Sequence, residues 1–508
     1  MSPGGGAHHS NRPARGLEKR AMMKRITIDP ITRLEGHGRI EIFLNGGGEV
    51  ENAYFQVPEL RGFEEFFRGR PVEEMPRITT RICGVCPSAH HMASAKAVDA
   101  VYHVEPPVTA RKLRELLYSA FYAGDHGLHF YYLGGPDFVV GPKAPAAERN
   151  ILGVIGKVGL EIGKRVIRHR AECQEAIGIV GGKAIHPVCA VPGGVSKPIS
   201  EAERTRLEEI ATNAVEFGQF SLKLFDDVVL ANSEYVDLIQ SEPYSLESYY
   251  MGLVDEHNRV NFYDGQLRIV HPDGEEVAKF PAEQYLNYLA EHVEPWTYLK
   301  FPYLKKVGWR GLVEGPDNGI YRVAPLARLN AADGMATPLA QAEYERMYSV
   351  LGEKPVHATL AQHWARLIEM LYAAERMLEL SRDPEITGTV IRTMPSAEPR
   401  EGVGVVEAPR GTLIHHYRTD PHGLVERANL IVGTGNNYAA ICLSIKKAAA
   451  EVLRGEDTSS EGLLNMVEMA FRAYDPCLAC ATHALSEGPT IEIAIRGPDG
   501  ELLRTIRA

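Results

Sequence analysis

The chain has 508 residues, 44% of them hydrophobic and 24% charged, which is the composition of an ordinary globular protein. Its formal net charge of −11 gives no electrostatic basis for nucleic-acid binding. No apolar run reaches the roughly 18 residues of a membrane-spanning helix. Seven cysteines are too few, and odd in number, for a disulfide framework, so we expect a reducing, cytoplasmic location.

The first 25 residues differ from the rest of the chain. They are basic and rich in Gly, His and Pro, yet they lack the apolar stretch of a secretory signal. We interpret residues 1–25 as a disordered leader. Extended, partly alternating apolar residues then predict β structure over 26–60, and a short helix is expected within 59–70.

Apolar residues at helical spacing dominate the remainder of the chain. They predict helices at 72–80, 90–104, 108–133, 148–178 and 199–240, with a Gly- and Pro-rich loop over 181–194. Residues 260–280 are expected to form a hairpin, and 295–340 to be irregular. There follow helices at 338–351 and 359–382, a β-rich block at 388–433, helices at 437–454 and 460–473, and a final hairpin at 489–507.

No linker or repeat interrupts this series after residue 25. The pattern therefore predicts a mainly α fold: a bundle of long helices with small β elements near the N-terminus and around residues 388–433. We expect residues 26–483 to form a single domain, because two motifs near its opposite ends have to meet.

Those two motifs are Cys-x-x-Cys pairs. The first joins Cys83 and Cys86, the second joins Cys477 and Cys480, and they lie 477 − 83 = 394 residues apart. Four thiols in two such pairs predict a metal site, because thiolates bind Zn, Fe–S clusters and electron-rich Ni and Fe. On spacing alone, a structural four-cysteine zinc site is the commoner outcome.

Three features argue against structural zinc. The pairs would close almost the whole chain, whereas structural zinc sites usually staple short segments. A histidine follows each pair, His90 after the first and His483 after the second. A charged residue precedes each pair, Arg81 and Asp475 respectively.

The other three cysteines are scattered: Cys173, Cys189 and Cys442. This isolation indicates small buried apolar residues rather than a second metal cluster. Electrons produced by redox chemistry at the four-cysteine site would therefore have to leave through a partner protein.

Four stretches together resemble the signature motifs of nickel–iron hydrogenase large subunits. They are Asp29-Pro-Ile-Thr-Arg-Leu-Glu-Gly-His37, Arg81-Ile-Cys-Gly-Val-Cys-Pro-Ser-Ala-His90, Glu407-Ala-Pro-Arg-Gly411 and Asp475-Pro-Cys-Leu-Ala-Cys-Ala-Thr-His483. They occur in the family's order, so the resemblance covers the chain from about residue 26 onward. It implies the hydrogenase large-subunit fold and reversible, heterolytic cleavage of H2 at a Ni–Fe centre.

The resemblance also implies how that centre is held. Cys83 and Cys477 would bind Ni alone, whereas Cys86 and Cys480 would bridge Ni and Fe. The iron would carry CO and CN⁻ ligands. His90 would donate a hydrogen bond to a bridging sulfur.

Three further residues match positions at which the family handles protons and H2. Glu35 matches the proton-relay carboxylate, which takes a proton from a cysteine thiol. Arg410 matches an arginine placed over the open metal position, and Asp125 matches its carboxylate partner, with Asp475 a second candidate. For any one of these residues alone, a surface position or surface ion pair would be the ordinary interpretation.

Glu64 and His483 match the ligands of a hard cation, which is Mg²⁺ in this family, with a backbone carbonyl and waters completing an octahedron. We expect that carbonyl within Thr434-Gly-Asn-Asn437. Beyond His483 lie 508 − 483 = 25 residues. The resemblance implies that this tail, 484–508, is removed by a specific maturation protease after nickel insertion, and that it holds the C-terminus open until then.

The stretch from Glu407 to Tyr417 resembles the cytoplasmic, bidirectional branch of the family. This branch implies that the partner is an iron–sulfur small subunit, and that further subunits couple H2 to NAD(P), a deazaflavin or a heterodisulfide-type acceptor. Two other functions stay open at this point. One is a metal-free large subunit like that of respiratory complex I, which the four cysteines disfavour, and the other is an interaction module stabilised by zinc.

Overall fold

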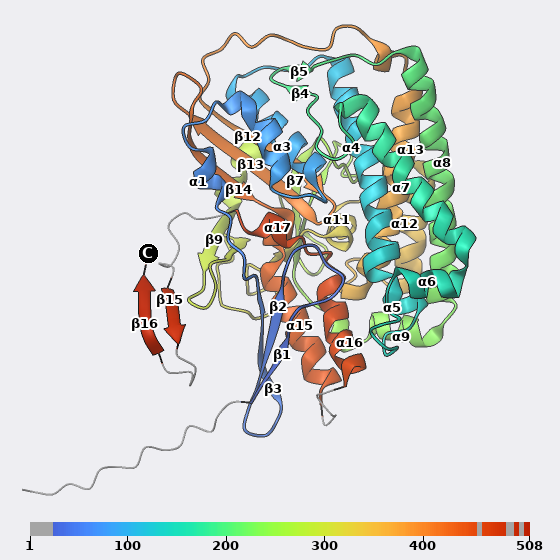
Figure 1. Ribbon diagram of the computed structural model, residues 1–508, viewed down its shortest axis with the longest axis vertical. Helices are drawn as coiled ribbons and strands as arrows, with labels where there is room; N and C mark the ends of the chain where they lie inside the picture. Colours follow the sequence, from blue (N-terminus) through green and yellow to red (C-terminus); the bar gives the residue numbers. More distant parts are fainter. Residues whose placement is uncertain (1–23, 455–459, 484–491, 497–501, 508) are drawn as a thin grey trace, which may run out of the picture.

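The computed structural model describes residues 24–454, 460–483, 492–496 and 502–507. A bundle of long helices stands on one side of the molecule, and small sheets and short helices pack along its flank (Figure 1). The mainly α fold expected from the sequence is confirmed, and most predicted helices and strands lie within a few residues of their expected bounds. Among the described residues, no helix has the length and apolar character needed to cross a membrane.

Four helices make the bundle: α4 (Val108–Leu128), α7 (Leu160–Gly181), α8 (Glu201–Phe225) and α13 (Gln362–Arg382). α13 packs against both α4 and α8, and α4 packs against α7. The start of α8 is fixed by a capping box, in which Ser200 Oγ accepts from the Glu203 N–H and the Glu203 carboxylate accepts from the Ser200 N–H. α12 (Pro338–Leu351) adds a further layer on α13.

Two long predicted helices are interrupted. The helix expected at 148–178 is split by Gly159, which has a φ of 96°, into α6 (Ile151–Val158) and α7. The helix expected at 199–240 passes from α8 through a π-helical turn, Asp226–Leu230, into α9 (Ser233–Gln240). A second π-helical turn, His129–Gly134, continues α4.

One sheet is antiparallel, with strand order β12-β13-β14. Its strands are β12 (Glu401–Ala408), β13 (Gly411–Thr419) and β14 (Val425–Ile431), and α3 (Pro87–Val101) lies across one face (Figure 1). The N-terminal sheet consists of β1 (Lys24–Ile28), β2 (Arg39–Leu44) and β3 (Val50–Gln56). It begins at Lys24, so the last two residues of the predicted leader belong to a strand, while residues 1–23 lie outside the described part.

The expected hairpin at 260–280 is part of a larger sheet of order β11-β6-β7-β8. Its strands are β6 (Tyr249–Val254), β7 (Gln266–Val270), β8 (Glu276–Phe280) and β11 (Tyr321–Arg322). The prediction that 295–340 is irregular was wrong. This region holds β10 (Lys300–Leu304), which pairs with β9 (Leu289–Val293), as well as β11 and α11 (Pro325–Ala331). Its strands are so short that their own residues carry little periodicity, and pairing with a partner strand defines them.

The C-terminal part follows the predicted order. α15 (Tyr438–Val452) and α16 (Glu461–Arg472) pack together beside the N-terminal sheet, and α17 (Leu478–Ala481) follows. The final hairpin is confirmed as β15 (Glu492–Arg496) paired antiparallel with β16 (Leu502–Arg507). The remaining short elements are α1 (Phe63–Phe67), α2 (Met75–Ile78), α5 (Pro136–Val139), α10 (Tyr285–Tyr288), α14 (Gly433–Asn436), β4 (Ala190–Val191) and β5 (Gly194–Val195).

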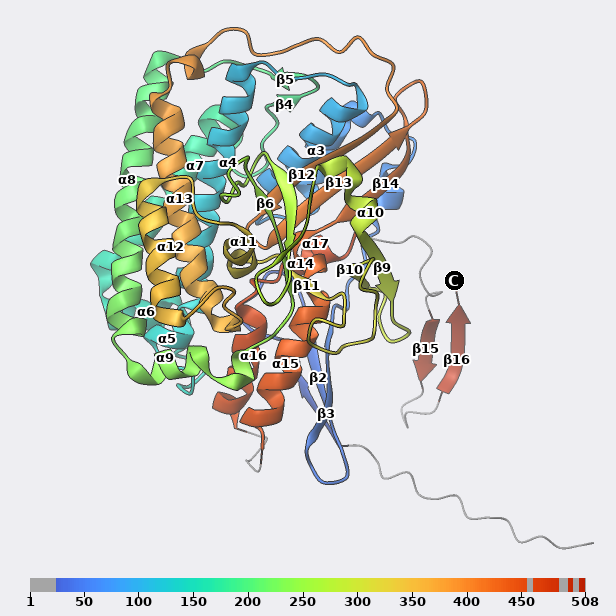
Figure 2. The same ribbon diagram turned by 180° about the vertical axis from the view of Figure 1, so that it is seen from behind.

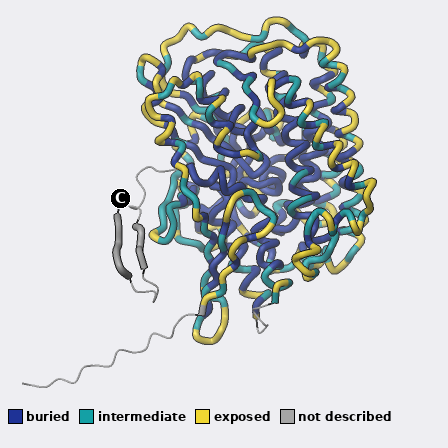
Figure 3. Tube along the Cα trace, in the orientation of Figure 1, coloured by how far each residue is buried: buried dark blue, intermediate teal, exposed yellow. Residues whose placement is uncertain are grey.

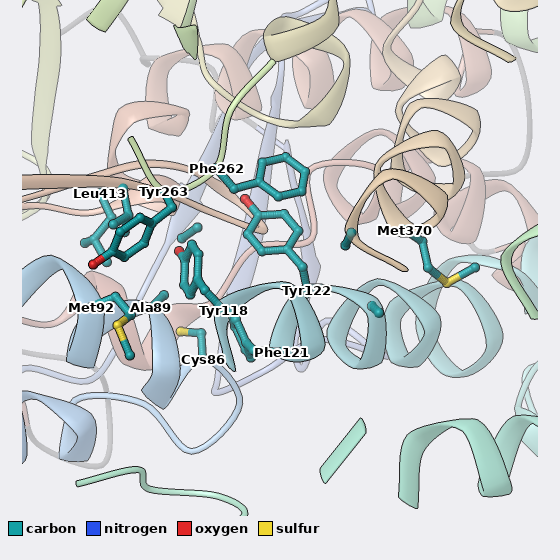
Figure 4. Packing of buried hydrophobic residues seen from close by; sticks show 14 of the residues in the cluster. Cys86, Ala89, Met92, Tyr118, Phe121, Tyr122, Phe262, Tyr263, Met370 and Leu413 are labelled. Atoms are coloured by element: carbon teal, nitrogen blue, oxygen red, sulfur yellow. The ribbon is translucent and has the colours of Figure 1, made fainter. Parts of the chain in front are cut away.

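The second Cys-x-x-Cys motif lies where two apolar cores meet. Cys477 and Cys480 belong to the core of the bundle and α3, whereas Leu478 and Ala481 belong to the core of α15 and the N-terminal sheet. Buried residues concentrate along this junction (Figure 3). Figure 4 shows Cys86 of the first motif close to the aromatic side chains of Tyr118 and Phe121 in α4. The junction therefore brings the two ends of the chain together.

Candidate metal centre

The four sulfurs of the two Cys-x-x-Cys motifs converge at the junction of the two cores. Each Sγ lies within 4.8 Å of the others, and all four cysteines are buried. The closest pairs of Sγ atoms are Cys83 and Cys477 at 3.2 Å, Cys86 and Cys480 at 3.1 Å, and Cys477 and Cys480 at 3.0 Å. The sequence prediction that the pairs meet across the chain is confirmed.

The first pair is arranged by its immediate sequence neighbours. It forms a tight turn between a short 3₁₀ helix, Thr79–Arg81, and α3, and Cys86 occupies the N-cap position of α3. Cys83 Sγ accepts hydrogen bonds from the N–H groups of Val85 and Cys86, at 3.2 and 3.3 Å. These N–H groups at a helix N-terminus have no intrahelical partner, so they stabilise a thiolate at this position.

The second pair is held by residues distant in sequence. Glu35 and Cys477 form a parallel bridge, in which the Leu478 N–H donates to the Glu35 carbonyl at 3.1 Å. The Cys477 N–H donates to Thr434 Oγ1 at 2.9 Å. A side chain at Gly36, whose φ is 85°, would place its Cβ 2.9 Å from the Cβ of Leu478, so this close approach requires glycine.

The Glu35 side chain reaches into the same cluster. Its Oε2 lies 3.1 Å from Cys477 Sγ and accepts a hydrogen bond from the Ala479 N–H at 2.9 Å. Burial and the nearby Cys83 raise the pKa of Glu35 above that of an ordinary carboxyl, although the Ala479 N–H opposes the shift. The geometry thus places a proton-exchanging group in direct contact with one sulfur.

Arg410 lies between two buried carboxylates. Its Nη1 is 3.1 Å from Asp125 Oδ2 and its Nη2 is 3.0 Å from Asp475 Oδ2, while its Nε donates to the Asp475 carbonyl at 3.0 Å. Burial alone would lower the pKa of the guanidinium, but the two carboxylates raise it well above its ordinary value. Both predicted carboxylate partners are therefore in place, and Arg410 stays charged although it is only 3% exposed.

His90, the histidine that follows the first pair, contacts the second pair. Its Nε2 lies 3.2 Å from Cys480 Sγ. Burial lowers the pKa of His90 to about 4, so the ring is neutral at neutral pH.

Glu64 and His483 also lie together, with Glu64 Oε1 3.8 Å from His483 Nε2. The backbone carbonyl beside them belongs to Leu430, 2.7 Å from His483 Nε2, and not to the segment 434–437 that the sequence indicated. That segment lies in α14 and at its C-terminal end, where the side chains of Thr434 and Asn437 contact the backbone of Cys477 and Arg410 instead.

The pair and the Leu430 carbonyl fit a hard cation. Glu64 Oε2 is buried and has no hydrogen-bond partner among the described residues. A carboxylate, an imidazole nitrogen and a backbone carbonyl, together with water, can provide the ligands of such an ion. The four buried thiols equally fit a group of soft metals, because thiolates are soft ligands and one arginine cannot balance the charge of four of them in a core.

Arg61 is a site residue that the motifs did not indicate. Its Nη2 donates to the carbonyl of Ile82, directly before the first pair, at 2.6 Å, and also to the carbonyl of Ala479, inside the second pair. Its Nε donates to Thr482 Oγ1 at 2.9 Å. One guanidinium therefore ties the two motifs together, a role that only the tertiary structure reveals.

The three remaining cysteines, Cys173, Cys189 and Cys442, are free and buried, as predicted. Burial raises the pKa of each, to about 12 for Cys173 and Cys442 and to about 11 for Cys189. Among the described residues, they join no group of three potential metal ligands.

Comparison with known proteins gives consistent matches over nearly the whole chain. The family model for nickel-dependent hydrogenases matches residues 61–151 and 165–483, and a model described as HoxL-like matches residues 25–60. A protein of Archaeoglobus profundus, named as an iron-sulfur subunit of the F420-non-reducing hydrogenase, is 49% identical over 485 residues. The match covers 96% of this chain and 100% of that protein.

Two further matches extend this result. The beta subunit of the NAD-reducing hydrogenase HoxS of Cupriavidus necator is 40% identical, over 92% of this chain and 97% of its own length. The crystal structure of an NAD⁺-reducing [NiFe]-hydrogenase in the H2-reduced state superimposes with a TM-score of 0.85 and 38% identity, covering 91% of this chain and 99% of that chain.

Proposed function

The chain belongs to the nickel-dependent hydrogenase family and is the catalytic subunit of a hydrogenase with a Ni–Fe centre, and on that premise we propose how its residues share the reaction. The observation that carries the proposal is the convergence of four buried thiols on one point that Glu35, Arg410 and His90 surround. A structural zinc site needs none of these three side chains, and the metal-free complex I subunit lacks the thiols.

When bound, the Ni–Fe group, with CO and CN⁻ on iron, would supply the open position at which H2 is polarised and cleaved. Cys83 and Cys477 would hold Ni as terminal ligands, and Cys86 and Cys480 would bridge the two metals.

Glu35 receives the proton that heterolytic cleavage releases. It lies 3.1 Å from Cys477 Sγ, so a proton on that sulfur can pass to Oε2 in one step. The Ala479 N–H fixes the carboxyl group in this position. The raised pKa of Glu35 lies closer to the pKa of a thiol, which makes proton transfer between the two groups easier in both directions.

Arg410 presents its charge to the centre of the site. Asp125 and Asp475 hold the guanidinium from two sides, so no conformational freedom is lost when H2 arrives. A fixed cation next to the thiolates stabilises negative charge that develops during cleavage.

Glu64, His483 and the Leu430 carbonyl would bind Mg²⁺. The ion would fasten the end of the second cysteine motif to α1 and β14. The Glu64 N–H also donates to the His483 carbonyl, at 3.2 Å, so the backbone already makes part of this attachment.

Other subunits carry the electrons. Relatives of this chain are named as single subunits of hydrogenases with several subunits. Because the other three cysteines of this chain are isolated and buried, we propose that the electrons pass, in the cytoplasm, to an iron–sulfur small subunit. One relative is named NAD-reducing and another F420-non-reducing, and we propose that further subunits determine whether the acceptor is NAD(P), a deazaflavin or of the heterodisulfide type.

We also propose that a maturation protease removes residues 484–508 once nickel is bound. His483 is buried inside the site, and its backbone and ring are both engaged there. A free C-terminus at this residue would let the second motif close over the metals. Intact-mass measurement of the active complex is expected to show a chain that ends at His483, and active protein that retains the tail would contradict this.

Infrared absorption together with metal analysis tests the whole proposal. The purified complex is expected to contain one Ni per chain and to show CO and CN⁻ stretching bands, which no zinc or thiol site produces. One Zn per chain without Ni, and no such bands, would replace the hydrogenase assignment with the zinc-stabilised module.

A further inference from the structure

Arg328, in α11, contacts the turn that carries Arg410. This turn joins β12 to β13, and Pro409 and Arg410 are its two central residues, because the ladder ends with Ala408 opposite Gly411. Arg328 Nη1 donates to the carbonyl of Ala408 at 2.9 Å, and Nη2 donates to the carbonyl of Pro409 at 3.0 Å. The Arg328 side chain is fully buried, although it belongs to none of the four signature motifs.

The turn needs such donors because it is buried. The carbonyls of the two central residues of a hairpin turn cannot pair within the ladder, and in a core each needs another donor. Arg328 supplies one to Pro409, and Asn437 Nδ2 supplies one to the Arg410 carbonyl at 2.9 Å. Three successive carbonyls, 408–410, thus each accept from a side chain.

Two carboxylates hold the Arg328 guanidinium in this orientation. Glu369 of α13 contacts it twice, with Oε1 2.6 Å from Nε and Oε2 2.6 Å from Nη2. Glu407 Oε2 lies 3.1 Å from Nη1. A planar guanidinium bound at both edges cannot rotate, so its N–H groups point at fixed positions on the turn.

Aromatic rings border the guanidinium as well. Its Cζ lies 5.8 Å from the ring centroids of Tyr122 and Phe262. These two rings are stacked, with centroids 3.8 Å apart (Figure 4). In such a buried, low-dielectric place a hydrogen bond from a charged group is stronger than at the surface, so Arg328 holds the turn firmly.

The same network reaches the carboxylate that pairs with Arg410. Glu369 Oε2 lies 2.9 Å from His126 Nε2, and His126 follows Asp125 in α4. Asp125 Oδ2 is 3.1 Å from Arg410 Nη1. Arg328 is therefore connected to the backbone of Arg410 through the turn and, through Glu369, to the helix that carries its partner.

We propose that Arg328 is a positioning residue that sets where the Arg410 guanidinium lies relative to the four sulfurs. The inference rests on the proposed role of Arg410. Asp125 and Asp475 hold the end of the Arg410 side chain, whereas Arg328 holds the backbone from which that side chain extends. A misplacement of about 1 Å in a group that acts on the reacting centre can cost about 10²-fold in rate.

Arg114 offers a matched control. It is buried to the same extent, in α4, and its Nη1 lies 2.5 Å from Asp99 Oδ2. Its Nη2 donates to the carbonyls of Val191 and Gly194, at 3.0 and 2.7 Å, in the hairpin of β4 and β5. Both arginines thus join a carboxylate to two carbonyls of a hairpin, but the hairpin of Arg114 does not carry Arg410.

A double-mutant cycle tests the proposal. H2 turnover per bound Ni is measured in the purified multi-subunit complex for Arg328→Lys, for Arg410→Lys and for the double variant. Lysine keeps the charge of Arg328 but cannot reach both carbonyls and both carboxylates. Arg328→Lys alone is expected to retain Ni and to lose about tenfold in turnover. In the Arg410→Lys background it is expected to change turnover by less than about twofold, because the group that it positions is already gone.

A role of Arg328 in stability alone would give the same fold loss in both backgrounds. Arg114→Lys is expected to lower Tm as Arg328→Lys does and to leave turnover per Ni unchanged. Parental turnover in Arg328→Lys, an equal fold loss in both backgrounds, or an equal loss in Arg114→Lys would overturn the proposal.

If Arg328→Lys yields no Ni-loaded enzyme, Glu369→Gln takes its place in the cycle, since it keeps the side-chain volume and removes the charge that orients Arg328. A loss in the parent and none in the Arg410→Lys background is again expected, and parental turnover or an equal loss in both overturns the proposal. Parental turnover in Arg410→Lys itself would instead overturn the proposed role of Arg410, and this inference with it.

Discussion

The two cysteine motifs have the same spacing but reach their positions by different means. The first lies at the N-terminus of α3, and its Cys83 sulfur accepts from N–H groups two and three residues away. The second depends on Glu35, on Thr434 of α14 and on Arg61, all more than 40 residues distant. Figure 2 shows α14 and α17 side by side at the centre of the molecule. One half of the site is therefore a local structure, and the other half forms only when the whole chain has folded.

This difference has a functional consequence. Three side chains that could move protons or stabilise charge contact the second motif: Glu35 at Cys477, His90 at Cys480, and Arg410 at Asp475. The second motif, which is assembled last, is therefore the one that these functional side chains surround. Changes at these contacts should alter activity or the order of the second motif, and leave the first motif intact.

The largest effect is expected for Glu35→Gln. The amide oxygen can still accept from the Ala479 N–H, so the motif stays in place, but the group can no longer take a proton from Cys477. H2 turnover should fall by about 10³-fold, within the range for loss of a general base, with Ni content retained. Dye reduction by H2 and metal analysis check this. Glu59→Gln, at an exposed neighbouring carboxylate, should keep full activity. Parental turnover in Glu35→Gln would remove this residue from the proton path.

A somewhat smaller loss is expected for Arg410→Lys. Lysine keeps the charge but cannot contact Asp125, Asp475 and the Asp475 carbonyl at the same time. H2 turnover should fall by about 10²-fold while both metals remain bound. As a control, Arg418→Lys, at an exposed arginine near the end of β13, should have no effect on turnover. Full activity in Arg410→Lys would reject the placement of its guanidinium over the site.

Arg61→Ala tests the tie between the two motifs. It removes the donors to the Ile82 and Ala479 carbonyls and to Thr482 Oγ1. The free energy of unfolding should fall by about 1–2 kcal/mol, the usual cost of losing hydrogen bonds to a partly exposed charged group. Thermal unfolding measures the change. Arg68→Ala removes an exposed arginine that pairs with Glu65, and should change stability by much less. Equal effects of the two substitutions would contradict the role of Arg61.

The smallest effect is expected for Thr434→Val, which preserves shape and removes the acceptor of the Cys477 N–H. The cost should be about 1 kcal/mol. Hydrogen exchange should quicken in a peptide covering 475–483 and stay unchanged in one covering 82–90. Thr434→Ser keeps the hydroxyl and should restore slow exchange. Faster exchange in both peptides would show that the two motifs are one cooperative unit, and the first motif could then no longer be regarded as a local structure.

Much of the fold could be predicted from the sequence because helices and hairpins produce recognisable patterns of residues within a short stretch of the chain. The 3.6-residue period of apolar residues located α12 and α13 almost to their observed bounds, and turn residues indicated the final hairpin. The break at Gly159 and the strands within 295–340 were missed. A single glycine, or a strand of two residues such as β11, has no period of its own.

The residue types of the site were also determined by the sequence alone. Four cysteines in two pairs, with Glu35, Arg410 and two histidines in neighbouring motifs, specified soft-metal chemistry with a base and a cation at hand. Only the tertiary structure decided which groups touch. The carbonyl beside His483 belongs to Leu430 and not to residues 434–437. Arg61 contacts both motifs, and His90 contacts His415. Periodicity and motifs record interactions between neighbours in the chain, whereas these contacts depend on how α3, β13 and α17 pack, which no local stretch encodes.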